Sequence, residues 1–176
     1  MEELERVLIN RKEIAQRVKE LASSISQDYQ KETVLFVGVL KGAVVFLADL
    51  IRNMSIPVEI DFMAVSSYGN STKSSGEVRI LKDLEQSIDN KNVLIVEDIM
   101  DTGLTLQFLS KTLQQRHPLS IRVVTLLDKP QKRLVNIQPD YLGFTVGDNF
   151  VVGYGLDFGE KFRGLPDIHV LKTIKG

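Results

Sequence analysis

Three carboxylates fall within five residues of one another in this chain, at Glu97, Asp98 and Asp101. Carboxylate oxygens are suitable ligands for a magnesium ion, and they accept hydrogen bonds from the hydroxyl groups of a sugar. Like charges placed this close together repel one another unless a cation or a hydroxyl-rich ligand lies among them. The spacing therefore indicates a site that binds a metal ion or a sugar.

A turn rich in threonine and glycine follows the carboxylates and opens a segment with helical spacing at 102–115. The exposed N–H groups and the dipole of a helix N-terminus favour an anion such as phosphate. Gly103 has no side chain to keep that anion away from the backbone. Acidic residues also occur at helix starts without any ligand, so the Asp-Thr-Gly sequence alone leaves both interpretations open. The motifs G-x-x-x-x-G-K-[ST] and G-x-S-x-G are absent, and no G-x-G-x-x-G follows the first strand.

The elements that must position these residues alternate between strand and helix. Apolar runs rich in β-branched residues predict buried strands at 34–40, 92–97 and 121–127. The spacing of apolar residues predicts helices at 43–53, at 102–115 and from the N-cap Asn10 to Tyr29. Shorter strands are expected at 58–65, 78–81, 141–146, 150–152 and 169–171. We therefore predict a single α/β domain over 1–176, with a mainly parallel central sheet and helices on both of its faces. Such a sheet binds ligands at the carboxyl ends of its strands.

Composition and charge exclude several classes of protein. The 176 residues are 43% hydrophobic and 26% charged, as in ordinary soluble domains. The absence of cysteine excludes disulfides, thiolate metal sites and a cysteine nucleophile, and two histidines leave little for a zinc site. A net charge of −1 provides no basic field for nucleic acid or an anionic membrane, and the apolar run at 34–40 is far too short to cross a bilayer. Since the chain also starts without a signal-peptide pattern, we expect a cytoplasmic protein with no nucleic-acid or membrane partner.

The segment VLIVEDIMDTGLT at 93–105 resembles the phosphoribosyl-pyrophosphate binding motif of the type I phosphoribosyltransferases. Its Glu-Asp pair followed by Asp101 is similar to the hypoxanthine (hypoxanthine-guanine) phosphoribosyltransferase branch. GVLKGA at 38–43 resembles the pyrophosphate loop of that family, and AVSSYG at 64–69 resembles its mobile catalytic loop. LLDKP at 126–130 and DNFVVGYGLDF at 148–158 resemble its purine-binding segments. These matches follow one another at family-like spacing across nearly the whole chain.

The resemblance implies a reaction of purine salvage. The 5-phosphoribosyl group of phosphoribosyl pyrophosphate is transferred to hypoxanthine or guanine, which gives IMP or GMP and pyrophosphate. Displacement at the anomeric carbon passes through an oxocarbenium-like state, so the site must stabilise a cationic sugar and remove a purine proton. The resemblance also implies a magnesium cofactor, small-molecule partners, a homodimer or homotetramer, and a small hood of C-terminal and N-terminal segments.

The resemblance further implies roles on the ribose and phosphate side. Asp101 is expected to be the general base at the purine imidazole nitrogen, and its charge favours the cationic sugar. Glu97 and Asp98 should contact the ribose hydroxyls, directly or through magnesium. The 5′-phosphate should be held, mostly by backbone, at Asp101, Thr102, Gly103, Leu104 and Thr105. Pyrophosphate should be bound by Leu40, Lys41, Gly42 and Arg163, and the family has a non-proline cis peptide in that loop.

On the purine side, Lys129 is expected to hydrogen-bond the purine carbonyl, Phe150 to stack on the base and the Val151 backbone to read its edge. Asp157, also assigned to purine binding, should help to hold a second magnesium ion, so the implied metal ligands are Glu97, Asp98 and Asp157. Ser67 and Tyr68 should close over the site and exclude water. The segment 66–76 should be mobile without ligand and ordered when substrates are bound.

Other interpretations remain open at this point. Lys129 before Pro130 is compatible with a surface turn, Phe150 with plain core and Lys41 with a solvated charge. The chain could be an RNA-binding regulator that keeps this fold, although its neutral charge lacks the basic face such a function needs. It could use xanthine or adenine, but a lysine that reads a carbonyl argues against adenine. A non-catalytic nucleotide-binding module would need no base at Asp101.

Overall fold

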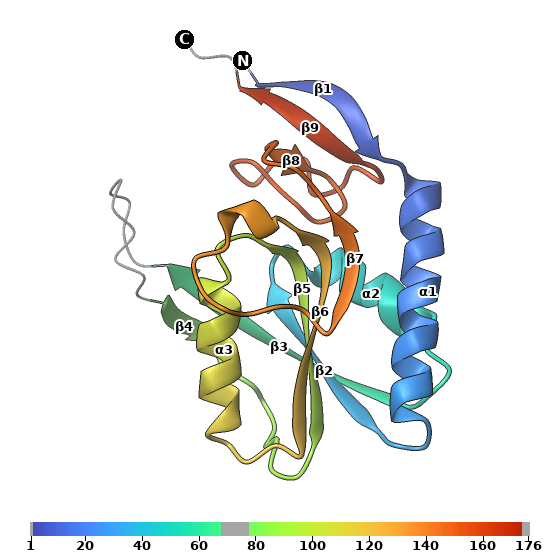
Figure 1. Cartoon of the computed structure of the whole chain (residues 1–176), viewed down its shortest axis with the longest axis vertical. Helices are drawn as coiled ribbons and strands as arrows, with labels where there is room; N and C mark the ends of the chain where they lie inside the picture. Colours follow the sequence, from blue (N-terminus) through green and yellow to red (C-terminus); the bar gives the residue numbers. More distant parts are fainter. Residues whose placement is uncertain (1, 68–77, 174–176) are drawn as a thin grey trace.

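A computed structural model describes residues 2–67 and 78–173 (Figure 1). The helices are α1 (Arg11–Tyr29), α2 (Val44–Arg52) and α3 (Leu104–Gln114), with a 3-10 turn at Pro130–Lys132. The strands are β1 (Glu2–Ile9), β2 (Val34–Leu40), β3 (Val58–Ser67), β4 (Val78–Lys82), β5 (Asn92–Met100), β6 (Ser120–Asp128), β7 (Tyr141–Thr145), β8 (Val151–Val152) and β9 (Ile168–Thr173). Within these ranges no helix is long and apolar enough to cross a membrane.

The central sheet has six strands in the order β4-β3-β2-β5-β6-β7. β2 pairs in parallel with both β3 and β5, β5 pairs in parallel with β6, and β6 with β7. Only the edge strand β4 runs antiparallel, beside β3. Five parallel strands place their carboxyl ends at one edge of the sheet, and the predicted mainly parallel α/β sheet is confirmed.

Helices cover both faces of the sheet, as predicted (Figure 1). Alternate residues of a strand point to opposite faces, so each strand contributes to two cores. On β2, Val34 and Phe36 belong to the core cluster that contains the buried residues of α1 and α2. Leu35 and Val37 belong to the second cluster, which contains the buried residues of α3. A central strand buried on both faces needs a continuous apolar run, which explains the composition of 34–40.

A second, three-stranded sheet of order β1-β9-β8 forms the hood that the resemblance implied (Figure 1). Strand β1 is an element that the sequence analysis did not predict. Half of its residues are charged, most are at least partly exposed, and its register shifts twice along β9, so it lacks clear apolar alternation. The pairing of β1 depends on β9, at the other end of the sequence, which no local pattern reveals.

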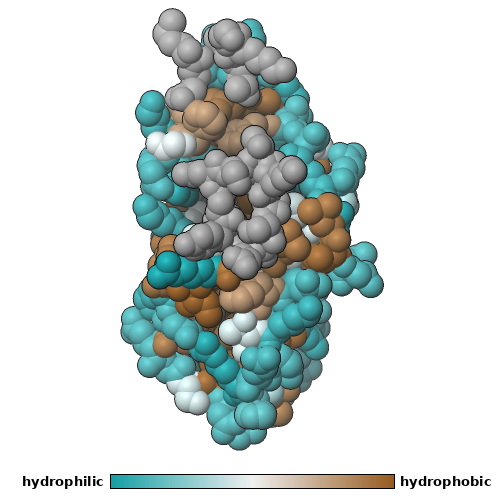
Figure 2. Space-filling view, turned by 90° about the vertical axis from the view of Figure 1, so that its left-hand side faces the viewer, coloured by the Kyte–Doolittle hydropathy of each residue, from teal (hydrophilic) through white to brown (hydrophobic). Residues whose placement is uncertain are grey.

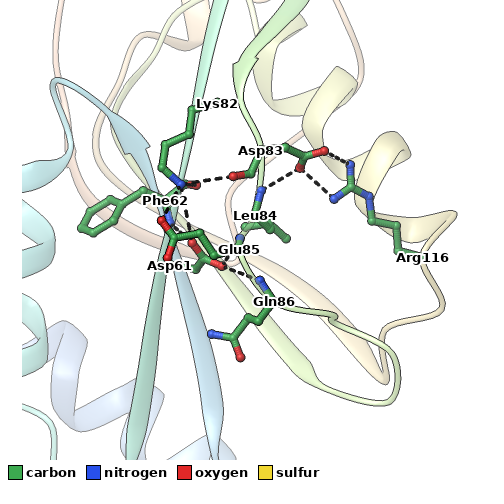
Figure 3. A network of polar contacts seen from close by, with 8 residues as sticks. All are labelled: Asp61, Phe62, Lys82, Asp83, Leu84, Glu85, Gln86 and Arg116. Atoms are coloured by element: carbon green, nitrogen blue, oxygen red, sulfur yellow. Dashed lines mark hydrogen bonds and ion pairs between the residues drawn. The ribbon is translucent and has the colours of Figure 1, made fainter.

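The side of the molecule where β4 and α3 lie presents hydrophobic residues between hydrophilic ones (Figure 2). Beneath that surface, a polar network fixes the segment that follows β4 (Figure 3). The buried carboxylate of Asp61, on β3, accepts backbone N–H groups of Phe62 at 2.7 Å and Glu85 at 2.9 Å, and the Lys82 ammonium lies 4.0 Å from it. Next to it, Asp83 accepts two hydrogen bonds of 2.8 Å from Arg116.

Replacing Asp61 by alanine should lower the free energy of unfolding by about 2–4 kcal/mol, because it leaves the partly buried N–H groups of Phe62 and Glu85 without their acceptor. Asp83→Ala removes a carboxylate whose side chain is 48% exposed, so screening limits the loss to under about 1 kcal/mol. The hydrogen bonds from Arg116 lower the pKa of Asp83, so its contribution is present at neutral pH and fades as the pH falls through that lowered pKa. Urea unfolding of both variants measures these free energies, and an equal loss of unfolding free energy in the two variants at pH 7 would contradict the prediction.

Candidate active site

The carboxylate pair lies within β5 rather than after it. The sequence analysis predicted that this strand ends before Asp98, but β5 pairs with β6 as far as Met100. The extra residues are held by long-range pairing to β6, which the change from apolar to acidic residues conceals. Consequently only Asp101 follows the strand, while Glu97 and Asp98 belong to its last residues.

Glu97 lines a cavity of about 390 Å³ at the carboxyl end of the sheet. Its carboxylate accepts the N–H of Asp98 at 3.2 Å, and the Asp98 carboxylate accepts the N–H of Ile99 at 2.7 Å. Burial and the charge of Asp98 raise the pKa of Glu97 well above its usual range, and burial also raises that of Asp98. Two buried neighbouring carboxyl groups of this kind suit a ligand that brings a cation or hydroxyl donors.

The phosphate-type turn lies at the start of α3 and lines the same cavity. Asp101, Thr102, Gly103 and Thr105 contribute to the lining. Helix α3 begins at Leu104 rather than at Thr102, because Gly103 adopts a left-handed conformation with φ of 82° before the first helical residue. A Cβ at Gly103 would lie 2.7 Å from the side chain of Ile137, so the turn is tightly packed from behind.

The loop at 40–42 closes against the carboxylates. The Leu40–Lys41 peptide bond is cis, as the resemblance implied. A Cβ at Gly42 would lie only 1.7 Å from Oδ2 of Asp98, so only glycine allows this approach. Lys41 is exposed and pairs with Glu160 at 3.1 Å. The loop and the carboxylate pair are therefore in direct contact, although they are more than 50 residues apart in sequence.

Lys129 is buried, with its side chain 6% exposed, so the interpretation as a surface turn is wrong. Its Nζ donates to the backbone oxygen of Asn149 at 2.7 Å and lies 4.0 Å from Oδ1 of Asp101. Burial lowers the pKa of Lys129, while the charge of Asp101 opposes this shift. Oδ1 of Asp101 is itself shielded from solvent and accepts no hydrogen bond within the described part of the chain. The two groups face each other at the edge of the cavity.

The segment after Asn149 places an aromatic ring on the surface. Phe150 is 46% exposed, so it is not plain core, and its ring packs edge-on against Phe158 with 5.4 Å between centroids. Val151 is buried in β8. Farther along, the Asp157 carboxylate pairs with Arg163 at 3.1 Å and accepts the N–H of Glu160 at 2.8 Å. An exposed ring beside a buried lysine and a carboxylate is suited to bind a flat base with polar edges.

Comparison with known proteins identifies the family. A phosphoribosyl transferase domain matches residues 7–159. A hypoxanthine-guanine phosphoribosyltransferase of Bacillus subtilis (strain 168) is 53% identical over 170 residues, which cover 97% of this chain and 94% of the relative. This chain belongs to the hypoxanthine-guanine phosphoribosyltransferase family. A hypoxanthine phosphoribosyltransferase structure from Staphylococcus aureus superposes with a TM-score of 0.93 at 48% identity, over 96% of this chain and 92% of that one. A hypoxanthine-guanine phosphoribosyltransferase structure from Bacillus anthracis gives 0.92 at 43% identity, over 98% and 100%.

The structure of this phosphoribosyltransferase brings most of the expected site residues to one region. Residues of the β5–α3 segment share a cavity with Leu40, and Arg163 is close enough to Asp98 for its charge to act on that carboxyl group. Leu104 does not line the cavity. Ser67 ends β3 opposite Val78, whereas Tyr68 and residues up to 77 lie outside the described part of the chain, so the expected loop closure stays a prediction.

The three expected metal ligands of the phosphoribosyltransferase are not assembled into one cluster. In the ranges 2–67 and 78–173, no three acidic or histidine side chains meet in a way that could hold a metal ion. Asp157, which was expected to help to hold a second magnesium ion, forms an ion pair with Arg163. The sequence analysis also missed Arg133 and Gly155. Arg133 contacts the turn at Asp101, and a Cβ at Gly155 would lie 2.2 Å from the carbonyl oxygen of Gly42.

Proposed function

We propose that this enzyme transfers the 5-phosphoribosyl group from phosphoribosyl pyrophosphate to hypoxanthine or guanine with Asp101 as general base and Lys129 as reader of the purine carbonyl. The observation that carries the proposal is the 4.0 Å separation between the Lys129 ammonium and the Asp101 carboxylate, beside the cavity at the start of α3. A 6-oxopurine presents a carbonyl and an imidazole nitrogen on neighbouring edges. One donor and one acceptor side by side match these two groups.

In the proposed reaction, Asp101 removes the proton of the imidazole nitrogen beside the carbonyl, while the other imidazole nitrogen bonds to the anomeric carbon and pyrophosphate leaves. Its Oδ1 is shielded and accepts no hydrogen bond in the described residues, so that oxygen is available for the proton. The ring of Phe150 stacks on the base, the Val151 backbone reads its edge, and Lys129 donates to the carbonyl. Glu97 and Asp98 accept the ribose hydroxyls, and their charges favour the cationic sugar.

The anions are held at the other side of the cavity. The turn from Asp101 to Thr105 receives the 5′-phosphate at the N-terminus of α3. Pyrophosphate is received by Leu40, Lys41 and Gly42, whose loop touches Asp98. Arg163, now paired with Asp157 and Glu160, is placed to reach it as well.

The neighbouring carboxylates of Glu97 and Asp98 fit a magnesium ion, because they offer hard oxygen donors at the cavity that Glu97 lines. Magnesium commonly takes only one or two protein carboxylates and completes its shell with phosphate and water oxygens, which agrees with the absence of a three-ligand cluster in the described residues. The ion would neutralise charge on the pyrophosphate leaving group. We propose further, from the resemblance alone, a cytoplasmic homodimer or homotetramer.

Replacing Lys129 by methionine should raise the KM for hypoxanthine or lower kcat/KM by about 5- to 150-fold, because the purine carbonyl loses a donor worth about 1–3 kcal/mol. The KM for phosphoribosyl pyrophosphate should change little. Lys132→Met is the matched control, since Lys132 lies one turn away and is 42% exposed in a pair with Asp148. Steady-state kinetics with each substrate varied decides the point. An equal loss for both substrates would show that Lys129 does not read the purine.

A further inference from the structure

Arg133 joins three separate segments behind the active site. The residue follows the 3-10 turn at Pro130–Lys132, and its side chain is 15% exposed. Its guanidinium donates to the backbone oxygen of Asp101 at 3.0 Å and to that of Ile137 at 3.1 Å. It also forms an ion pair with the carboxylate of Asp128. One side chain thus holds the turn after β5, the end of β6 and the loop that follows.

Two of these contacts reach the residues to which the mechanism assigns chemistry. Asp101 is held through its own carbonyl oxygen, and Asp128 is the residue directly before Lys129. Oδ1 of Asp101 accepts no hydrogen bond within 2–67 and 78–173, so the hydrogen bond from Arg133 to the carbonyl oxygen of the same residue helps to fix the position of this side chain. The backbone N–H of Lys129 also donates to the backbone oxygen of Met100 at 2.9 Å. The ends of β5 and β6 are therefore joined by this bond as well as through the guanidinium.

We propose that Arg133 is a positioning residue that sets the distance and orientation between the Asp101 carboxylate and the Lys129 ammonium, and this rests on the proposed function. A guanidinium is planar and presents several N–H groups at fixed angles, so it can bind a carboxylate and two carbonyl oxygens at once. A lysine keeps the positive charge but is a flexible point charge that cannot reproduce this geometry. A positive charge at position 133 is therefore not enough to hold the Asp101 and Asp128 segments in place.

Arg133→Lys should lower kcat about 10- to 100-fold, the loss expected for a misplacement of about 1 Å between reacting groups. The KM for phosphoribosyl pyrophosphate should change less than threefold. Arg116→Lys is the matched control, because Arg116 also makes two hydrogen bonds to an aspartate (Figure 3), and neither residue lines the cavity. Its kcat should stay within twofold of the wild type.

The decisive readout is Arg133→Lys in an Asp101→Asn background. If Arg133 acts through Asp101, the Arg133→Lys substitution should lower the residual kcat of Asp101→Asn less than threefold, because the group that Arg133 positions is already inactive. A loss as large as in the wild-type background overturns the proposal, as does a normal kcat in the single variant. Near-normal turnover of Asp101→Asn itself would instead overturn the proposed function, so the two failures are distinguishable.

Should Arg133→Lys not fold, Asp128→Asn provides the same test from the other side of the ion pair. Asparagine keeps the shape of Asp128 but removes the charge that holds the guanidinium. It should lower kcat about 3- to 30-fold in the wild-type background and less than twofold beside Asp101→Asn. A normal kcat, or equal losses in both backgrounds, overturns the positioning role.

Discussion

Replacing Asp101 by asparagine should lower kcat by about 10²–10⁴-fold, the usual contribution of a positioned general base. Asparagine keeps the shape and the hydrogen-bonding ability of the side chain but cannot take the imidazole proton. The affinity for phosphoribosyl pyrophosphate should be largely kept, because we propose that the backbone turn at 102–105, which lines the cavity, receives the phosphate. Nucleotide binding could even tighten slightly, since one negative charge beside two other carboxylates is removed.

Single-turnover kinetics together with equilibrium binding of phosphoribosyl pyrophosphate checks the Asp101 prediction. Asp89→Asn serves as the control for loss of one carboxylate, because Asp89 is exposed and lies before β5, away from the cavity. Near-normal turnover in Asp101→Asn would contradict the assignment of the base. A loss confined to substrate affinity would make Asp101 a binding residue and transfer the role to another carboxylate.

Removal of magnesium by excess chelator should reduce activity to background. Pyrophosphate is a highly charged leaving group, and the loop proposed to bind it touches Asp98, the neighbour of the buried Glu97. Without a cation, the anionic substrate and these carboxylates repel each other. Activity should return when magnesium is added back, while circular dichroism stays unchanged throughout. Full activity in excess chelator would exclude the metal requirement.

The elements that the sequence predicted well are those whose burial is local and continuous. The run at 34–40 must be apolar throughout because both faces of β2 are covered, and Asn10 caps α1 as predicted, with Glu13 completing a capping box. Strand β1 could not be predicted, because half of its residues are charged and its place in the sheet depends on pairing with β9. The end of β5 was misplaced for the same reason, since its last residues pair with β6.

Within the candidate site, the residues of a compact motif could be predicted and the contacts between motifs could not. The segment 97–105 carries its chemistry in adjacent residue types, which a sequence shows directly. The packing of Gly42 against Asp98 joins segments far apart in the chain. Arg133 gave no signal, because an arginine in a loop is usually solvated and its partner Asp101 lies 32 positions earlier.

The most direct measurement of the central claim is nucleotide formation by the wild-type chain from phosphoribosyl pyrophosphate and magnesium with each of four purines, hypoxanthine, guanine, xanthine and adenine. Hypoxanthine or guanine should give its nucleoside monophosphate together with one equivalent of pyrophosphate. Adenine should give no nucleotide, because the buried ammonium of Lys129 cannot accept a hydrogen bond from an amino group. Turnover of adenine in preference to hypoxanthine and guanine, or no nucleotide from either of these two bases, would contradict the account.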